Sequence, residues 1–409
     1  MNIRTHLDKI RDEQERNHRF LHLTPNEPYM SQTAGTFMNS PLAQRYYLGA
    51  GENDMVDENP FTALGFPGIA QLVAAAENAT KQMLGATVVN LSCLSGVHAM
   101  MCAILSTTEP GDTVMTIHHD HGGHFATKGI IDRIGRKHIF TKYNQSEMKF
   151  DAKAIAQSFH QAKAKVFYMD ASYYINPHNL RDIREALGDE AIIIYDASHT
   201  MGLIMGEQFQ NPLAEGADII CANTHKTLPG PQKGMIAFRD EKLGNEANAT
   251  INSCLYSSPH TATLIALSIT ILEMKEYGKA YAQQIISNSN TLGEALESAG
   301  FQVRRANTGR ISENHQVHLF TEEVGEYRRL YKQLYNNSIT VAFDDGAILG
   351  GGMFIRLGTQ EITRRGMKED EMRKIAGFLK DSLTGLTSTK KVEAFNDQYR
   401  HAHYSFDTS

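Results

Sequence analysis

Seven short apolar runs, alternating with stretches of helical periodicity, constrain the fold of this chain more than any other feature. The runs occupy residues 87–92, 113–118, 137–142, 165–170, 191–195, 218–222 and 234–238. Helical patterns separate several of them, at 96–107, 123–134, 151–162 and 178–187. Continuous apolar runs are typical of strands buried on both faces, and helical crossovers favour parallel pairing. The pattern predicts an α/β fold with a mostly parallel, doubly wound, seven-stranded sheet.

The rest of the chain predicts a smaller α+β part and an N-terminal extension. A helical stretch at about 261–299 comes first. Four strand candidates follow it, at 301–306, 315–320, 339–343 and 353–357, and two helical patterns accompany them, at 325–336 and 368–383. Ahead of the sheet we expect an amphipathic helix over 1–19 with Ile3, Leu7 and Ile10 on one face, an extended arm over 21–31, and a helix over 68–83 that ends at Gly85. Three parts result: a helix and arm over 1–60, a large domain over 61–275 and a small C-terminal domain over 276–409.

Composition excludes several classes of function. The net charge of −6 and the pI of about 6.3 give no nucleic-acid footprint. No window is apolar enough to span a membrane, and the charged N-terminus lacks the apolar core of a secretory signal, so we expect a cytoplasmic protein. The four cysteines lack CxxC spacing and lie in apolar surroundings. We interpret them as buried, reduced thiols rather than disulfides or metal ligands: Cys93, Cys102, Cys221 and Cys254.

Two neighbouring apolar runs end in chemically active residues. Ile192-Ile-Ile-Tyr is followed by Asp196, and the run at 217–222 by Asn223-Thr-His-Lys226. Ligands of open α/β sheets bind beyond the carboxyl ends of the strands. A lysine and an aspartate delivered there suit pyridoxal phosphate (PLP), because the lysine forms a Schiff base and the aspartate keeps the pyridine nitrogen protonated. Taken singly, Lys226 could be a surface lysine and Asp196 a helix cap or turn residue.

Three further motifs could complete such a site. Ser95-Gly96 opens a helix, where free N–H groups suit a phosphate, although a simple Ser N-cap gives the same pattern. The cluster of histidines at 118–124 could indicate zinc, but no carboxylate pattern accompanies it, and His124 could instead stack on a planar cofactor. Arg356 is a cation in an apolar strand and needs an anion such as a substrate carboxylate.

With these residues in place, the chain resembles the serine hydroxymethyltransferase family of PLP enzymes, of fold type I, from about Leu21 to Gly366. The motifs that carry the resemblance occur in order: RYYLGAG at 45–51, SG at 95–96, EPGDTV at 109–114, HGGH at 121–124, DASHTMGL at 196–203, THKTLPGPQKG at 224–234 and IRLGTQEITRRG at 355–366.

The resemblance implies a role for each site residue. Lys226 would form the Schiff base, Asp196 would pair with the pyridine nitrogen, and His124 would stack on the ring. The other cofactor-binding residues implied are Ser95, Gly96, His199 beside the phenolic oxygen, Asn223 and His225. Arg356 and Asn26 would bind the substrate, and Tyr47 would reach the site from the neighbouring subunit. A homodimer is therefore expected, with dimer contacts in residues 1–60 and PLP bound by the large domain.

The chain departs from the family pattern at positions tied to folate chemistry. Counting back from Arg45, the family's tyrosine and glutamate are replaced by Phe37 and Asn39, and asparagine cannot exchange a proton. Further departures are Val97 for a phosphate-binding serine, Gln232 for an arginine, and the segment 341–346 for an asparagine-rich loop.

These features predict a folate-independent, PLP-dependent aldolase or transaldolase. It would cleave the Cα–Cβ bond of a β-hydroxy amino acid such as threonine or serine, and could add the glycine unit to a second aldehyde. The first alternative is a folate-dependent serine hydroxymethyltransferase, and the second is transamination, elimination or decarboxylation on the same scaffold. A non-enzymatic PLP-binding protein is disfavoured because Lys226, Asp196 and Arg356 are all present.

Overall fold

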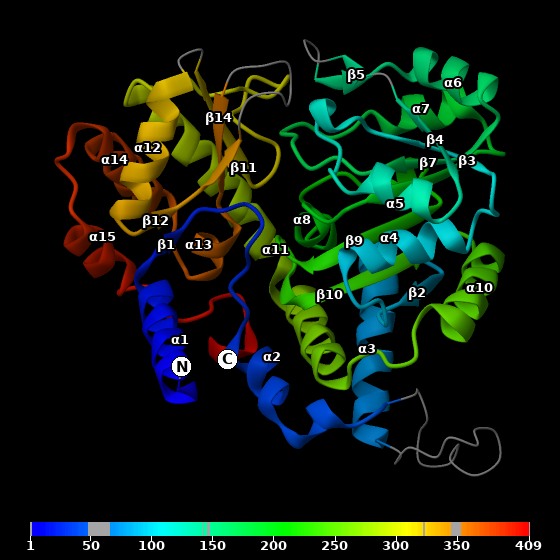
Figure 1. Ribbon diagram of the computed structural model, residues 1–409, viewed down its shortest axis with the longest axis horizontal. Coiled ribbons are helices and arrows are strands. Elements are labelled where there is room, and N and C mark those ends of the chain that lie inside the picture. The colour runs from blue at the N-terminus through cyan, green and yellow to red at the C-terminus, as the bar shows by residue number, and fades with distance from the viewer. Residues whose placement is uncertain are drawn as a thin grey trace.

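The structure of the protein is a computed structural model, which describes residues 2–47, 66–141, 143–144, 148–321, 324–344 and 353–408. It has a larger and a smaller part that lie side by side (Figure 1). The long helix α11 (Thr261–Ser298) runs between them and contributes to the apolar core of both. All the residues predicted to form the site fall within the described ranges, whereas much of the RYYLGAG motif and the end of segment 341–346 lie outside them.

The larger part is built on the predicted seven-stranded sheet. Its spatial order is β2 (Val88–Asn90), β10 (Pro229–Phe238), β9 (Ile219–His225), β8 (Ile192–Asp196), β7 (Ala164–Met169), β3 (Thr113–Thr116) and β4 (Lys137–Phe140). Strands β9, β8, β7, β3 and β4 pair in parallel, and β10 runs antiparallel to both of its neighbours. The predicted fold class is confirmed.

Helices cover both faces of this sheet, which explains why its strands are apolar throughout. Successive residues of a strand point to opposite faces. Ile193 and Ile220 enter one apolar cluster, while Ile194 and Ile219 enter another. The first cluster is covered by α3 (Pro67–Leu84), α6 (Ala152–Gln161), α7 (Leu180–Leu187), α8 (Met201–Met205) and α11, and the second by α4 (Gly96–Leu105), α5 (Thr127–Arg133) and α10 (Glu241–Thr250).

The smaller part contains an antiparallel sheet in the order β11 (Gln316–Thr321), β14 (Met353–Gly358) and β13 (Ala342–Asp344). Its helices are α12 (Val324–Asn336), α13 (Gln360–Arg364), α14 (Glu369–Thr384) and α15 (Thr389–Asn396). The N-terminal arm packs on this part, because β1 (Leu21–His22) pairs in parallel with β12 (Ile339–Thr340). The arm thereby carries residues near the start of the chain toward β14.

Short elements complete the described chain: α1 (Ile3–Arg19), α2 (Gln32–Gly35), the single turns η1 (Thr36–Asn39), η2 (Pro41–Gln44), η3 (His119–His121), η4 (Ile251–Leu255) and η6 (Phe406–Thr408), β5 (Tyr143–Asn144), β6 (Lys149–Phe150) and α9 (Pro212–Glu215). Helix α1 has no buried residue, and the predicted apolar face of Ile3, Leu7 and Ile10 is exposed on the single chain. Within the described ranges, no helix has both the length and the apolar character that a membrane span requires.

One strand prediction in the smaller part was wrong, and a second one proved to be two short strands. Segment 301–306 runs beside β11 but pairs only through the Val303–Leu319 bridge, because the chain turns away at 307–309. Segment 339–343 divides into β12 and β13, which pair with different strands. The three-part division stays a prediction, and its boundary at 275 falls inside α11, which is one continuous helix.

A fully buried ion pair joins α13 to α11, and hydrogen bonds of the same two side chains hold residues 404–406. Arg364 Nη2 lies 2.5 Å from Glu273 Oε2, and neither side chain is exposed. The second carboxylate oxygen accepts a hydrogen bond from the backbone N–H of Phe406 at 3.1 Å, and Arg364 also donates to the carbonyl of Tyr404. Burying two charges is costly, so this arrangement depends on each charge having its partner.

Replacing one partner of this ion pair should therefore lower the free energy of unfolding much more than replacing both. We expect Glu273→Ala to lower the free energy of unfolding by about 3–5 kcal/mol, since Arg364 is left buried and unpaired. The double variant Glu273→Leu/Arg364→Leu should recover a large part of that loss. Urea denaturation of the cofactor-free protein measures both values, with the exposed Glu246→Ala as the control. A single variant no less stable than the double variant would contradict the argument.

Candidate active site

Polar side chains from the ends of β7, β8 and β9 converge on one cavity of about 230 Å³. Asp196 is the last residue of β8, and Lys226 directly follows β9. The carboxyl ends of adjacent parallel strands lie at the same edge of a sheet, which brings the two residues together as predicted. Of the predicted residues, those that line the cavity are Ser95, Gly96, His124, Asp196, His199, Asn223, His225 and Lys226.

Lys226 lines this cavity and lies beside an imidazole. Its Nζ is 3.0 Å from Nε2 of His199. Burial lowers the pKa of Lys226 to about 8; the positive charge of Arg356 acts in the same direction, and Asp196 opposes it. A lysine with a lowered pKa provides the neutral amine that attacks a carbonyl group. Lys226 thus has the chemistry of a Schiff-base residue.

Both carboxylate oxygens of Asp196 are held in place. Oδ2 accepts a hydrogen bond from the Tyr168 hydroxyl at 2.5 Å, and Oδ1 accepts one from the backbone N–H of Ser198 at 2.8 Å. Burial raises the pKa of Tyr168 well above its usual value, so its hydroxyl stays protonated and remains a donor. Asp196 is therefore a fixed acceptor at the cavity wall.

His124 is positioned by a carboxylate that the sequence prediction missed. Asp170 follows β7 and accepts hydrogen bonds from the backbone N–H groups of His124, at 3.2 Å, and Ile117, at 3.3 Å. Its burial raises the pKa of its carboxyl group to about 7. The turn before His124 requires glycine, because a Cβ at Gly123 would lie 2.2 Å from the Ile117 carbonyl oxygen. An acid directly after a strand, as at Asp196, is the signal that could have identified Asp170.

The Ser95-Gly96 turn has features of both predicted alternatives. Ser95 caps α4, since its Oγ accepts the His98 N–H at 3.1 Å. The turn also lines the cavity and lies close to the end of β9, where a Cβ on Gly96 would come within 2.8 Å of Asn223 Cβ. Two buried polar atoms there have no partner, Asn223 Oδ1 and His225 Nδ1. Both atoms are available to a ligand, and a phosphate-bearing cofactor fits this end of the cavity.

Arg356 is held at the site by neutral groups. Nη1 donates to the Ser172 carbonyl at 2.8 Å and Nη2 to Oδ1 of Asn26 at 3.1 Å, while the guanidinium lies 4.1 Å from the centre of the Tyr173 ring. Its Nε is buried without a partner. Arg356 comes from β14 and Asn26 from the N-terminal arm, so the two predicted substrate-binding residues meet. A buried guanidinium of this kind suits an incoming carboxylate.

Of the residues that depart from the family pattern, Val97 lines this cavity, whereas Phe37, Asn39 and Gln232 do not, and neither does Tyr47. Tyr47 is packed in the core of the larger part, and its N–H donates to Thr261 Oγ1 at 3.1 Å. Phe37 and Asn39, both in η1, are exposed on the single chain, as is Gln232. Placing Tyr47 in the site of a neighbouring copy therefore stays a prediction.

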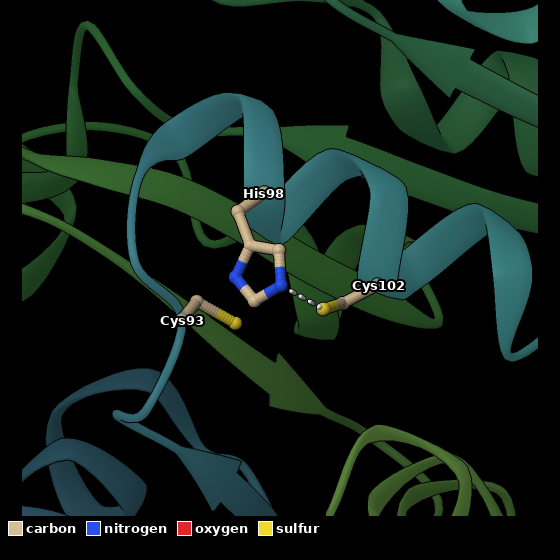
Figure 2. Close-up of side chains that lie close together, drawn as sticks. All are labelled: Cys93, His98 and Cys102. Atoms are coloured by element: carbon tan, nitrogen blue, oxygen red, sulfur yellow. Dashed lines mark hydrogen bonds between the residues drawn. The ribbon is translucent and has the colours of Figure 1, made fainter. Parts of the chain in front are cut away.

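A cluster of two thiols and an imidazole lies beside the Ser95-Gly96 turn. Figure 2 shows Cys93 and Cys102 on either side of the His98 ring, with Nε2 of His98 3.5 Å from the Cys102 sulfur. Hydrogen bonds from Cys93 and His98 lower the pKa of Cys102 to about 6. Among the described residues, only these three could share a metal ion.

The hydrogen bonds of His98 argue against a metal in this cluster. The Leu94 N–H donates to Nδ1 at 2.9 Å, so a neutral ring carries its proton on Nε2, which faces the Leu255 carbonyl at 2.9 Å and the Cys102 sulfur. A metal-binding histidine donates from one nitrogen and binds with the other. Here neither nitrogen is left to bind, and we interpret the group as a hydrogen-bonded cluster. Cys221 is also buried as predicted, but Cys254 is exposed, so the prediction of a buried thiol was wrong there.

Comparison with known proteins identifies the family of this chain. The family model described as serine hydroxymethyltransferase matches residues 4–379. A fluorothreonine transaldolase from Streptantibioticus cattleyicolor is 34% identical over 90% of this chain, which spans only 58% of that longer protein. A serine hydroxymethyltransferase from Methanocella arvoryzae is 31% identical over 99% of this chain and 96% of its own length.

A solved structure is similar over nearly the whole chain. It is the crystal structure of an L-threonine transaldolase from Pseudomonas fluorescens in the internal aldimine state, with 28% identity, a TM-score of 0.89, and coverage of 99% of this chain and 94% of that one. That state carries PLP on an enzyme lysine. The fold, the cofactor and the family predicted from the sequence are thereby confirmed, and the chain belongs to the serine hydroxymethyltransferase family of PLP-dependent enzymes.

Proposed function

We propose that this enzyme is a folate-independent aldolase or transaldolase of β-hydroxy amino acids, with threonine or serine as the donor. The observation that carries the proposal is a cavity lined by both Lys226 and Asp196, with Arg356 hydrogen-bonded to the carbonyl of Ser172 in the cavity wall. One relative that is similar in sequence and one solved structure that is similar in fold are named transaldolases, and both names support this reaction class. The acceptor would be a second aldehyde.

In this proposal each residue has one task toward the cofactor. Lys226 attaches PLP, Asp196 pairs with the pyridine nitrogen, and His124 covers the ring. The phosphate is held by Ser95, Gly96, Asn223 and His225, and His199 donates a hydrogen bond near Lys226. When bound, PLP withdraws electrons from Cα and so stabilises the negative charge that develops there when the Cα–Cβ bond breaks.

Arg356 and Asn26 would hold the substrate carboxylate. The guanidinium can present two N–H groups to a carboxylate in parallel, which fixes the orientation of the amino acid. Orientation matters because the bond that breaks must stand perpendicular to the cofactor ring. Ser172 and Tyr173 support this geometry by fixing the guanidinium plane.

The departures at Phe37 and Asn39 support folate independence. Neither side chain can exchange a proton near neutral pH, so the general acid–base step that the family's glutamate serves is lost at this position. Both residues lie in η1 on the surface of the chain. In the homodimer that we propose, η1 and Tyr47 would contribute to the neighbouring site.

One alternative has specific support. Several archaeal relatives named serine hydroxymethyltransferase are 31–35% identical to this chain, so folate-dependent transfer of a hydroxymethyl group remains the second candidate. Transamination, elimination and decarboxylation have no such support. A cytoplasmic location stays part of the proposal.

The reaction itself provides the first test. Incubation of the holoenzyme with threonine and an acceptor aldehyde, without folate, should release acetaldehyde and form a new β-hydroxy amino acid. Coupled reduction of acetaldehyde and chromatography of the amino acids measure the two products. The Lys226→Ala variant is the control and should form neither. Absence of both products with the wild-type enzyme, together with serine turnover that requires tetrahydrofolate, would favour the alternative.

The pKa of Lys226 predicts how cofactor attachment depends on pH. Only the neutral amine attacks PLP, so the attachment rate of the cofactor-free protein should rise with pH until about pH 8 and then level off. Stopped-flow absorbance measures this rate. A free lysine side chain, with its pKa near 10.4, serves as the reference and should continue to accelerate beyond pH 9. If the attachment rate of the protein depends on pH in the same way as that of the free amine, burial does not lower the pKa of Lys226.

Removal of the guanidinium should weaken substrate binding. We expect Arg356→Ala to raise the KM for the amino acid by roughly 30- to 100-fold, which corresponds to about 2–3 kcal/mol for a charged hydrogen-bonded pair. Steady-state kinetics with threonine measure the effect, and PLP absorbance verifies that the cofactor is still bound. The exposed Arg373→Ala variant is the control. An unchanged KM would place the carboxylate elsewhere.

A further inference from the structure

Strand β11 carries two buried polar side chains toward the active site. Gln316 and His318 are two residues apart and so point to the same face of the strand, while Val317 and Leu319 enter the core of the smaller part. Gln316 is fully buried and His318 is 2% exposed. Burial of an amide and an imidazole is unfavourable unless both are hydrogen-bonded. The hydrogen-bond partners of Gln316 and His318 therefore indicate the role of the two residues.

The partners fix the orientation of the Gln316 amide. Its Nε2 lies 3.1 Å from the carbonyl oxygen of Ser172, which can only accept a hydrogen bond, so the NH₂ group must face that oxygen. The opposite orientation would place two acceptors against each other. The amide oxygen then faces Nε2 of His318 at 3.0 Å, and that nitrogen must donate.

The same amide determines which nitrogen of His199 carries the proton. Gln316 Nε2 lies 3.4 Å from Nδ1 of His199 and can only donate to it. Nδ1 is therefore the acceptor. Burial, reinforced by the charges of Lys226 and Arg356, lowers the pKa of His199 well below its usual value, so the ring stays neutral. A neutral imidazole with an accepting Nδ1 carries its single proton on Nε2, the nitrogen 3.0 Å from Lys226, and the neutral amine form of Lys226 can accept a hydrogen bond from it.

The ring of His199 is also fixed from its other side. His315 stacks on it with 5.7 Å between ring centres and 20° between planes. His315 Nε2 in turn faces the Pro25 carbonyl at 3.3 Å. Rotation of His199 is thus restricted by packing, and its tautomer is left to the hydrogen bond from Gln316.

We propose that Gln316, oriented by His318, is a positioning residue that keeps the His199 proton on Nε2, so that His199 donates a hydrogen bond into the cavity at the Lys226 end. The functional consequence rests on the proposed placement of His199 beside the phenolic oxygen of PLP. At that position an N–H donor would stabilise negative charge on the oxygen, whereas the other tautomer would present a lone pair to it. Gln316 acts through His199 and touches neither substrate nor cofactor.

The tautomer of His199 can be measured without turnover. Protein labelled with ¹⁵N-histidine gives distinct nitrogen signals for the two tautomers, and comparison with His199→Asn identifies the signal among the 18 histidines. Above about pH 8, where Lys226 is mostly the neutral amine and can accept a hydrogen bond, we expect the proton on Nε2 in the cofactor-free wild type. Gln316→Met keeps the volume but removes the donor, so the signal should shift toward a mixture. Gln316→Glu supplies an acceptor and should move the proton to Nδ1.

A matched control separates this role from general loss of buried polar contacts. Gln210 is also a buried glutamine, bonded to the backbone of His178 at 2.8 Å and to the hydroxyl of Tyr195, away from the cavity. Gln210→Met should leave the His199 signal unchanged. His318→Leu should shift it part of the way, because the amide can then reorient. A wild-type proton on Nδ1, or an unchanged signal in folded Gln316→Met, would overturn the proposal.

Kinetics distinguish this inference from the proposed function. In Gln316→Met we expect kcat for threonine cleavage to fall about 3- to 10-fold, with KM within about twofold, and the absorbance maximum of bound PLP to shift. If the wild-type enzyme shows no transaldolase activity but the tautomer responds, the proposed function alone fails. If transaldolation occurs and the tautomer does not respond, this inference alone fails.

Discussion

The structure depends on the covering of both faces of the seven-stranded sheet. With apolar clusters on each side, a polar side chain in a strand interior would be buried without a partner. Chemically active residues are therefore confined to the strand ends, where Asp170, Asp196 and Lys226 follow β7, β8 and β9 in turn. Parallel pairing puts these strand ends at one edge of the sheet. The polar residues that line the cavity therefore lie together at that edge.

Burying charged groups at that edge lowers the stability of the folded protein, and a bound ligand can offset this loss. Burial disfavours the charged form of Lys226, and in the described part of the chain the hydrogen bonds of Arg356 go to a carbonyl and an amide, with an aromatic ring against the guanidinium. Such a site is less stable empty than filled, because ligands that bind only the folded state add their binding free energy to its stability. A phosphate at the Ser95-Gly96 turn and a carboxylate at Arg356 would supply the two missing anions.

The sequence predicted those features that depend on local pattern. All seven large-sheet strands were located, because runs buried on both faces are apolar throughout, and Asp196 and Lys226 stood out as polar residues ending such runs. Partners from distant segments could not be predicted. Gln316 meets His199 across 117 residues, and only the packing of one sheet against another decides that meeting. Segment 301–306 failed similarly, because its composition suits a strand whereas its pairing ends after one bridge.

The carbonyl of Ser172 shows how the two parts of the chain act as one site. It accepts hydrogen bonds from Arg356 of β14 and Gln316 of β11, which uses both of its lone pairs. Arg356 faces the proposed substrate carboxylate, and Gln316 determines the tautomer of His199 beside Lys226. One backbone oxygen in the loop after β7 therefore fixes the distance between the carboxylate end and the cofactor end. Because both donors come from the smaller part, the placement of that part on the larger one sets the geometry in which a Cα–Cβ bond can be cleaved.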